Sequence, residues 1–143
     1  IQKEGIILAK LSYQCANWNR GQAENKMTQL INRYGAEIEL VLSNNDEMAL
    51  GAVAAYDALE YPQDSRPVIL GIDGLDSALE AVKDGTIQGT VYNDKEGQAG
   101  QISRLAMDLF LDREPEDYDF ENERYIFLPY QKVTAANVEE FLH

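Results

Sequence analysis

The stretch VILGIDGLDSALEAVKDGTIQGTVY, residues 68–92, decides the fold expected for this chain. It begins with a short apolar run, continues with apolar residues at helical spacing, and ends in a second apolar run. Gly85 follows the helix-like segment 75–83, at the place where a glycine commonly ends a helix. The stretch therefore predicts a strand–helix–strand unit with its two strands parallel.

The same alternation continues on both sides of this unit. Strands are expected at 6–13, 38–43, 68–72 and 89–92, and helices at 18–34, 47–59, 75–83 and 97–111. The last of these helices carries Ile102, Leu105, Ala106 and Leu109 on one face. Four strand–helix pairs with short connections predict an α/β fold, an open parallel sheet with helices on both faces. The nearly continuous apolar strands agree, because both faces of a parallel sheet are covered.

The alternation ends after residue 111. Residues 112–124, DREPEDYDFENER, are crowded with acidic side chains and are interpreted as a solvated surface loop. Segment 125–130, YIFLPY, looks like one more strand, and Pro129 suggests an edge or a crossing rather than a central position. Thr134 is expected to cap a last helix at 135–142.

Composition limits the partners. The 143 residues include 25 acidic and 12 basic side chains, a net charge of −13, so nucleic-acid binding is not expected. One cysteine, Cys15, excludes an internal disulfide. The apolar runs are too short to span a membrane, and these 143 residues are not expected to include a signal peptide. Because IQKEG resembles a helix end at Gly5 without an initiator Met, we expect a piece of a longer protein.

Polar side chains and one indole follow the four predicted strands. In chain order they are Trp18, then Asn44, Asn45 and Asp46, then Asp73, and finally Asn93 and Asp94. Ligands of open parallel sheets bind outside the carboxyl ends of the strands, so we expect these side chains to share one edge. Taken singly, Asp46 is an ordinary helix N-cap and Asp73 an ordinary turn residue. Their shared edge is what favours a binding site.

The chemistry of this set matches a neutral polyol. Carboxamides donate and accept hydrogen bonds and carboxylates accept them, as vicinal hydroxyl groups require, and Trp18 offers a flat apolar face for a pyranose ring. No phosphate-binding glycine motif is present. Catalysis is not expected, because His143, the only histidine, is the final residue and Cys15 has no other histidine to activate it.

Several motifs resemble the C-terminal lobe of type I periplasmic sugar-binding proteins. They are ANWNRGQAENKM (16–27), SNNDEMALGAVAA (43–55), PVILGIDGLDSALEAVKDGTIQGTVYND (67–94) and LPYQKVTAANVEEFL (128–142). The resemblance runs from about Gly5 to the end of the chain. The tryptophan after the first strand and GTVYND at the fourth strand are most similar to the galactose/glucose-binding branch.

The resemblance implies two α/β lobes, joined by three crossover strands, that close over a sugar. This chain, residues 1–143, would be the C-terminal lobe, with 125–143 as the last hinge crossover and terminal helix. Residues Asn45, Asp73 and Asn93 would hydrogen-bond sugar hydroxyls, and Trp18 would stack on the ring. Asn44 and Asp46 would instead shape the turn and start the helix. Glu39 stands where this branch has a glutamate that completes a calcium site.

The function that the resemblance implies is the solute-binding component of an ABC-type sugar importer, which takes a hexose of the galactose/glucose type. Expected partners are the monosaccharide, the transporter permease and a chemoreceptor. The expected location is extracytoplasmic, in the periplasm or anchored as a lipoprotein, with membrane contact only through that anchor or the permease. No cofactor is expected, apart from calcium in the full-length protein. The alternative is the effector-binding core of a lactose-repressor-type transcription regulator, and a sugar-processing enzyme is a third, weaker hypothesis.

Overall fold

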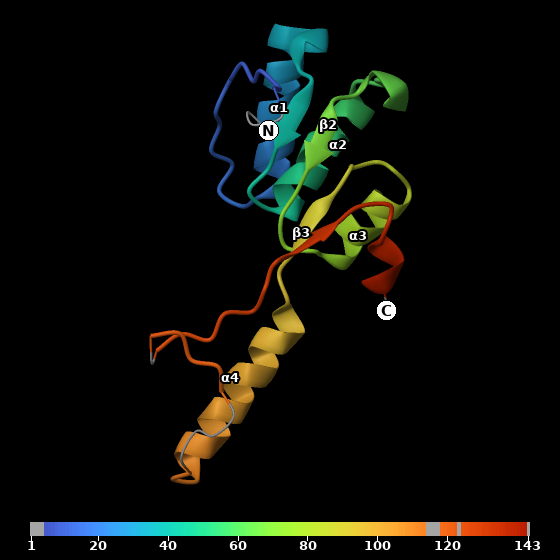
Figure 1. Cartoon of the computed structure of the whole chain (residues 1–143). Helices are drawn as coiled ribbons and strands as arrows, with labels where there is room; N and C mark the ends of the chain where they lie inside the picture. The colour runs from blue at the N-terminus through green and yellow to red at the C-terminus, as the bar shows by residue number, and fades with distance from the viewer. Residues whose placement is uncertain (1–4, 114–117, 123, 143) are drawn as a thin grey trace.

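The molecule has two helices packed side by side, a small twisted sheet with a third, short helix beside it, and a fourth helix that stands away from the rest (Figure 1). This computed structural model describes residues 5–113, 118–122 and 124–142. The helices are α1 (Arg20–Tyr34), α2 (Asp46–Ala58), α3 (Asp76–Lys83) and α4 (Lys95–Phe110). The strands are β1 (Leu40–Leu42), β2 (Val68–Leu70), β3 (Thr90–Tyr92) and β4 (Gln131–Val133). Short 3₁₀ turns occupy Gly35–Glu37, Gln63–Ser65 and Val138–Glu140.

The sheet confirms the parallel α/β prediction. Strands β1 and β2 are parallel, with Leu40 opposite Val68. Single parallel bridges, Leu70 to Gly89 and Asp73 to Tyr92, continue the pairing to β3, and β4 adds antiparallel to β3. The four helices predicted within the strand–helix alternation are present, each within two residues of its predicted ends. The strand–helix alternation therefore places the carboxyl ends of β1, β2 and β3 at one edge.

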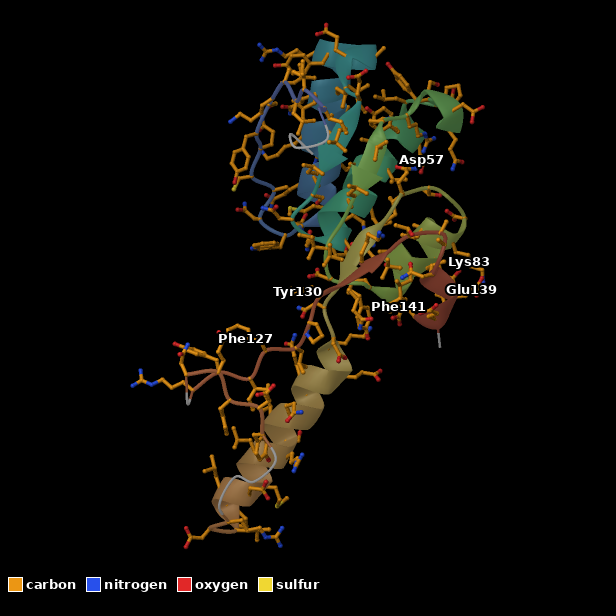
Figure 2. The ribbon with its side chains drawn as sticks, in the orientation of Figure 1. Asp57, Lys83, Phe127, Tyr130, Glu139 and Phe141 are labelled. Carbon is orange, nitrogen blue, oxygen red and sulfur yellow. The ribbon has the colours of Figure 1, made fainter. Side chains whose placement is uncertain are left out.

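The core lies between the sheet and helices α1, α2 and α3. Its largest fully buried apolar side chains are Tyr56, Ile69, Leu79, Ile87, Val82 and Val133. Complete burial of one such aliphatic side chain contributes about 1.5–3 kcal/mol. The C-terminal 3₁₀ turn is held to α3 by an ion pair between Lys83 Nζ and Glu139 Oε1, 3.2 Å apart (Figure 2). The strands that end at the sheet edge are therefore packed against a buried apolar core.

The first predicted strand, 6–13, is wrong for this structure. The segment has no regular secondary structure, and its side chains are largely exposed, Ile7 at 94%. It runs as an open loop beside α1 (Figure 1), to which it is joined by the bond from the Tyr34 hydroxyl to the Leu11 carbonyl, 3.2 Å. A strand needs a paired neighbour, and this segment forms no ladder with β1 in the part of the chain described.

The C-terminal predictions are displaced. Segment 125–130 contains no strand apart from an isolated bridge between Glu121 and Tyr125, and the strand follows one step later as β4. The predicted helix at 135–142 is only the turn Val138–Glu140. Thr134 is not its side-chain cap; instead the Asn137 side chain accepts a hydrogen bond from the Thr134 N–H, 2.9 Å. A segment of eight residues forms a stable α-helix only where tertiary contacts support it, as the buried residues of α3 do for that helix.

Helix α4 leaves the body of the domain (Figure 1). It contains no buried residue, and Ile102 and Leu109, on its predicted apolar face, are mostly exposed. The chain after it returns along the helix, where the Tyr118 hydroxyl donates to the Asp108 carboxylate, 2.7 Å. Farther along, Phe127 and Tyr130 are exposed (Figure 2). The acidic segment 112–124 is only partly described, because residues 114–117 and 123 lie outside the described residues. Most of the helix end predicted at residues 1–5 also lies outside them.

None of the described helices is both long enough and apolar enough to cross a membrane.

Candidate functional site

The carboxyl edge of the sheet brings together three of the predicted residues. Asn45 follows β1, Asp73 follows β2 and Asn93 follows β3. The backbone N–H of Asn93 donates to the Asp73 carbonyl at 3.0 Å, so these two residues are directly adjacent. Asn45 is linked to them through its neighbour Asp46, whose carboxylate accepts from the Gly74 N–H at 2.8 Å. The edge thus carries one carboxylate and two carboxamides within a connected backbone frame.

Asn45 and Asp46 have roles that differ from the sequence expectation. Asn45 is the N-cap of α2, in extended conformation, and its Oδ1 accepts from the Met48 N–H at 2.9 Å. The prediction that Asp46 caps this helix is therefore wrong, because Asp46 already has helical conformation. Among the described residues the amide nitrogen of Asn45 has no hydrogen-bond partner, so capping leaves this donor available to a ligand.

Asp73 is held in an uncommon backbone conformation. Its φ is 127°, a region that residues other than glycine rarely adopt. Gly74 follows with a φ of 74°, and a Cβ there would lie 2.4 Å from the Tyr92 ring, so no side chain fits. Non-glycine residues in such conformations persist where the surrounding structure enforces them, often at binding sites. The geometry favours a functional interpretation of Asp73 over an ordinary turn residue.

The electrostatics of Asp73 are also unusual. Burial raises the pKa of its carboxyl group above the ordinary value of 3.8, and the Asp46 carboxylate raises it further. A hydrogen bond from the Asp46 backbone lowers the same pKa and opposes both effects. A partly desolvated acceptor of this kind gains more from a ligand hydroxyl than an exposed one does.

Asn93 does not cap helix α4, because its neighbour Asp94 has that role. Asp94 is the N-cap of α4, and its carboxylate accepts from the Gly97 N–H at 2.9 Å. The Asn93 side-chain oxygen accepts from the Gln98 amide, so this side chain contacts the first turns of α4. The pair Asn93–Asp94 therefore divides into one residue for the helix and one for the candidate site.

Trp18 lies at the same end of the domain on an exposed turn. Its side chain is 65% exposed, which excludes the core position that a lone tryptophan commonly takes. Asn17 and Trp18 both have positive φ, 51° and 60°. An ion pair between Arg20 and Glu47, 2.9 Å, ties the start of α1 to the first turn of α2, directly after Asn45. The indole is thus available as a stacking surface near the polar edge.

Glu39 does not form a metal site with the other residues that the structure describes. It is exposed, and its carbonyl accepts from the Val68 N–H at 3.0 Å in the sheet. Within the described ranges no cluster of three or more potential metal-binding side chains is found. Calcium takes six to eight oxygen ligands, which a single glutamate does not supply. Calcium binding through Glu39 stays a prediction for a longer protein.

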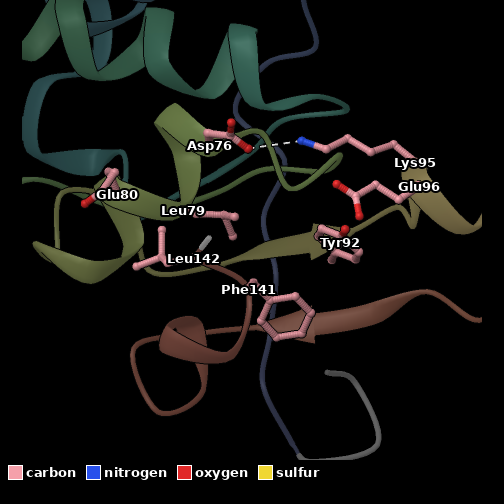
Figure 3. Close-up of a pocket in the computed structure, with 8 residues that line it drawn as sticks. All are labelled: Asp76, Leu79, Glu80, Tyr92, Lys95, Glu96, Phe141 and Leu142. Carbon is pink, nitrogen blue, oxygen red and sulfur yellow. Dashed lines mark hydrogen bonds and ion pairs between the residues drawn. The ribbon is translucent and has the colours of Figure 1, made fainter.

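A separate cavity of about 180 Å³ opens between α3, the start of α4 and the C-terminal turn (Figure 3). Its floor includes Tyr92 and Phe141, and an ion pair between Lys95 and Asp76, 3.0 Å, crosses its rim. None of the four candidate residues lines it. Sequence reasoning missed this cavity, because the C-terminal turn that closes it was predicted as a helix.

A parallel α/β domain that gathers a carboxylate, two carboxamides and an exposed indole at its strand ends has the properties of a small-solute-binding domain. The chain belongs to the periplasmic binding protein family, because the family model described as "Periplasmic binding protein domain" matches residues 1–114. This membership confirms the expected family and fold class, and it confirms that the chain is a binding module and not an enzyme.

Three relatives show which solutes similar members of the family are named for or contain. The chain is 30% identical to the D-galactose/methyl-galactoside binding periplasmic protein MglB of Haemophilus influenzae over 145 residues, 99% of this chain and 43% of that protein. It is 42% identical to a xylitol-binding protein of Mycolicibacterium smegmatis over 84 residues, 59% of this chain and 22% of that protein. A solved structure of an ABC transporter solute binding protein from Bacillus halodurans, with bound myo-inositol, is 36% identical with a TM-score of 0.73.

The chain spans only part of these relatives. The match to the Bacillus halodurans structure includes 88% of this chain but only 40% of that chain. The named relatives bind solutes, and none of these matches is a transcription regulator, so the regulator alternative gains no support.

Proposed function

We propose that this chain is the C-terminal lobe of the solute-binding component of an ABC-type importer, and that it supplies half of a site for a sugar. The observation that carries this proposal is the convergence of Asn45, Asp73 and Asn93 at the carboxyl edge of the sheet. A hydroxyl group needs both a donor and an acceptor, and the free amide of Asn45 together with the Asp73 carboxylate supplies both. Trp18 would cover the apolar face of the ring.

The leading ligand is a hexose of the galactose/glucose type. Such a ring carries adjacent hydroxyls for the polar edge and a C–H face for the indole, and the similarity to a galactoside-binding relative over 99% of the chain supports this choice. A second candidate is a cyclic polyol, because the relative with bound myo-inositol is 36% identical, more than the galactoside-binding relative. Both ligands have a six-membered ring with neighbouring hydroxyl groups.

The partners and location follow from this function and are part of the proposal. The loaded protein would pass its sugar to the transporter permease and would also present it to a chemoreceptor. It would work outside the cytoplasm, free in the periplasm or held by a lipid anchor. Residues 125–143 would form the last hinge crossover to the other lobe and the segment that packs beyond it.

The test is a titration of the full-length protein with galactose, glucose, ribose and myo-inositol. We expect heat of binding and a change in tryptophan fluorescence with at least one six-membered ring ligand, and weaker binding of ribose. Trp18→Phe should reduce the fluorescence response by the contribution of Trp18 and retain most of the heat, because the phenyl ring still covers the sugar. Absence of heat with all four compounds contradicts the proposed function, and tight binding of ribose alone contradicts the hexose assignment.

The raised pKa of Asp73 predicts a pH dependence with opposite signs for binding and for folding. Sugar affinity falls as pH decreases through the raised pKa, because the protonated carboxyl loses acceptor strength. Stability behaves in reverse: the folded state binds the proton more tightly than the unfolded state, so stability falls as pH rises from 3.8 through the raised pKa. Asp73→Asn removes both contributions, and the difference between wild type and variant, by calorimetry and thermal denaturation, isolates them from other carboxylates. Equal pH profiles for the two proteins contradict the prediction.

A further inference from the structure

We propose that Asp46 is a positioning residue for the sugar site: its buried carboxylate fixes the relative positions of the strand ends that carry Asn45, Asp73 and Asn93. This inference rests on the proposed function. It assigns Asp46 no contact with the sugar. Its role is to hold the three segments that carry the sugar-binding residues, which are far apart in sequence, in fixed relative positions.

The Asp46 carboxylate is fully buried and accepts three hydrogen bonds. Its Oδ2 accepts from the backbone N–H groups of Gly74 at 2.8 Å and Leu75 at 2.9 Å, and its Oδ1 accepts from the Thr90 hydroxyl at 2.7 Å. The relative exposure of Asp46 is 0%. These bonds join the start of α2 to the turn after β2 and to the first residue of β3.

An apolar residue at this position would leave the N–H groups of Gly74 and Leu75 without their acceptor. A carboxylate satisfies both, at the cost of burying a charge for which no ion pair is found within the described ranges. The positive end of the α2 dipole offsets part of this cost. What an apolar residue does not supply is a pair of directed acceptors that face two different segments at once.

The first segment held by Asp46 is the turn that contains Asp73. The two N–H groups bound by Oδ2 belong to the residues directly after Asp73, whose φ of 127° requires external support. The Asp46 carboxylate thus supports the conformation of the turn that carries the Asp73 side chain.

The second segment is β3, which leads to Asn93. Thr90 begins this strand and is buried, and the strand continues beside the Asp73 turn through the bond from Asp73 N–H to the Val91 carbonyl, 2.9 Å. The protein leaves room for the carboxylate at Gly71, where an added Cβ would lie 2.1 Å from Asp46 Oδ1. A displacement of the carboxylate would therefore move Asp73 and Asn93 relative to Asn45.

The experiment measures sugar affinity in the full-length protein by calorimetry, at a temperature where circular dichroism shows each variant folded. Asp46→Ala should weaken binding at least tenfold. Thr90→Val removes one of the three bonds without loss of bulk and should weaken binding three- to tenfold, whereas Thr90→Ser keeps the hydroxyl and should restore affinity. Val82→Ala, a core change at the far end of α3, should lower the melting temperature with affinity unchanged.

Each outcome decides the proposal. If Asp46→Ala does not fold, the Thr90 pair decides it. If Thr90→Val binds sugar as wild type does, or if Val82→Ala loses affinity to the same degree, Asp46 is only structural and the proposed function stands. If the wild-type protein binds no sugar, the proposed function and the positioning role fall together.

Discussion

Replacement of Asp73 with alanine lowers the affinity of the full-length protein for its sugar by more than tenfold. Hydrogen bonds to a charged group contribute about 1.5–3 kcal/mol each, and about 1.4 kcal/mol corresponds to a factor of ten in the dissociation constant. The partly buried position of this carboxylate places it toward the upper end of that range. We therefore expect a loss of well over ~1.5 kcal/mol in binding free energy by titration calorimetry.

The control for this prediction must separate the lost acceptor from backbone strain. Asp73 has a φ of 127°, which asparagine tolerates better than alanine does, so Asp73→Asn should keep the turn and still bind more weakly than wild type. Asp64→Ala, an exposed aspartate in the turn before β2 at the opposite edge of the sheet, should leave affinity unchanged. Wild-type affinity in Asp73→Ala would return Asp73 to the role of a turn residue.

The fold could be predicted from sequence wherever local pattern and tertiary packing agree. Strands β1, β2 and β3 are short apolar runs followed by helices with clear ends, so their parallel direction follows from the alternation. Segment 6–13 has the same local pattern, but a strand also requires a paired neighbour, which no local pattern reports. The helix face with Ile102 and Leu109 shows the same limit, because periodicity indicates an apolar stripe and does not indicate what covers it.

The residues predicted for the site do follow neighbouring strand ends of the sheet, but the N-cap of α2 was assigned to Asp46 and is Asn45. The sequence Asn44–Asn45–Asp46 offers three residues in a row that favour an N-cap, and the choice among them depends on where the backbone becomes helical. The Asp46 carboxylate, instead of capping the helix, accepts hydrogen bonds from the N–H groups of Gly74 and Leu75, 28 and 29 residues farther along the chain. Such long-range satisfaction of a buried carboxylate has no local signature in the sequence.

The second large effect concerns the packing that supports this edge. Gly51→Ala lowers the free energy of unfolding, although alanine favours a helix more than glycine does by about 0.5–1 kcal/mol. Gly51 lies in α2 where α1 crosses it, and an added Cβ would lie 2.3 Å from the Arg20 carbonyl oxygen and 2.9 Å from the Ala23 Cβ. A carbonyl in the main chain moves only with its helix, so α1 must shift. Overpacking of this kind costs about 1–3 kcal/mol, which exceeds the gain in helix propensity.

Gly21→Ala provides the matched comparison, because the same substitution is made in the partner helix. Gly21 is exposed, and its Cβ would meet only the Asn19 side chain, at an ordinary contact of 3.6 Å. Its stability should be unchanged or raised by up to about 1 kcal/mol. Chemical denaturation of both variants measures the two free energies of unfolding.

The same pair of variants also tests sugar binding. Arg20 and Glu47 join the same two helices beside Trp18 and Asn45. A shifted α1 in Gly51→Ala should therefore weaken sugar binding, whereas Gly21→Ala should not. Equal stability changes in the two variants would show that the contact between α1 and α2 is looser than the structure indicates.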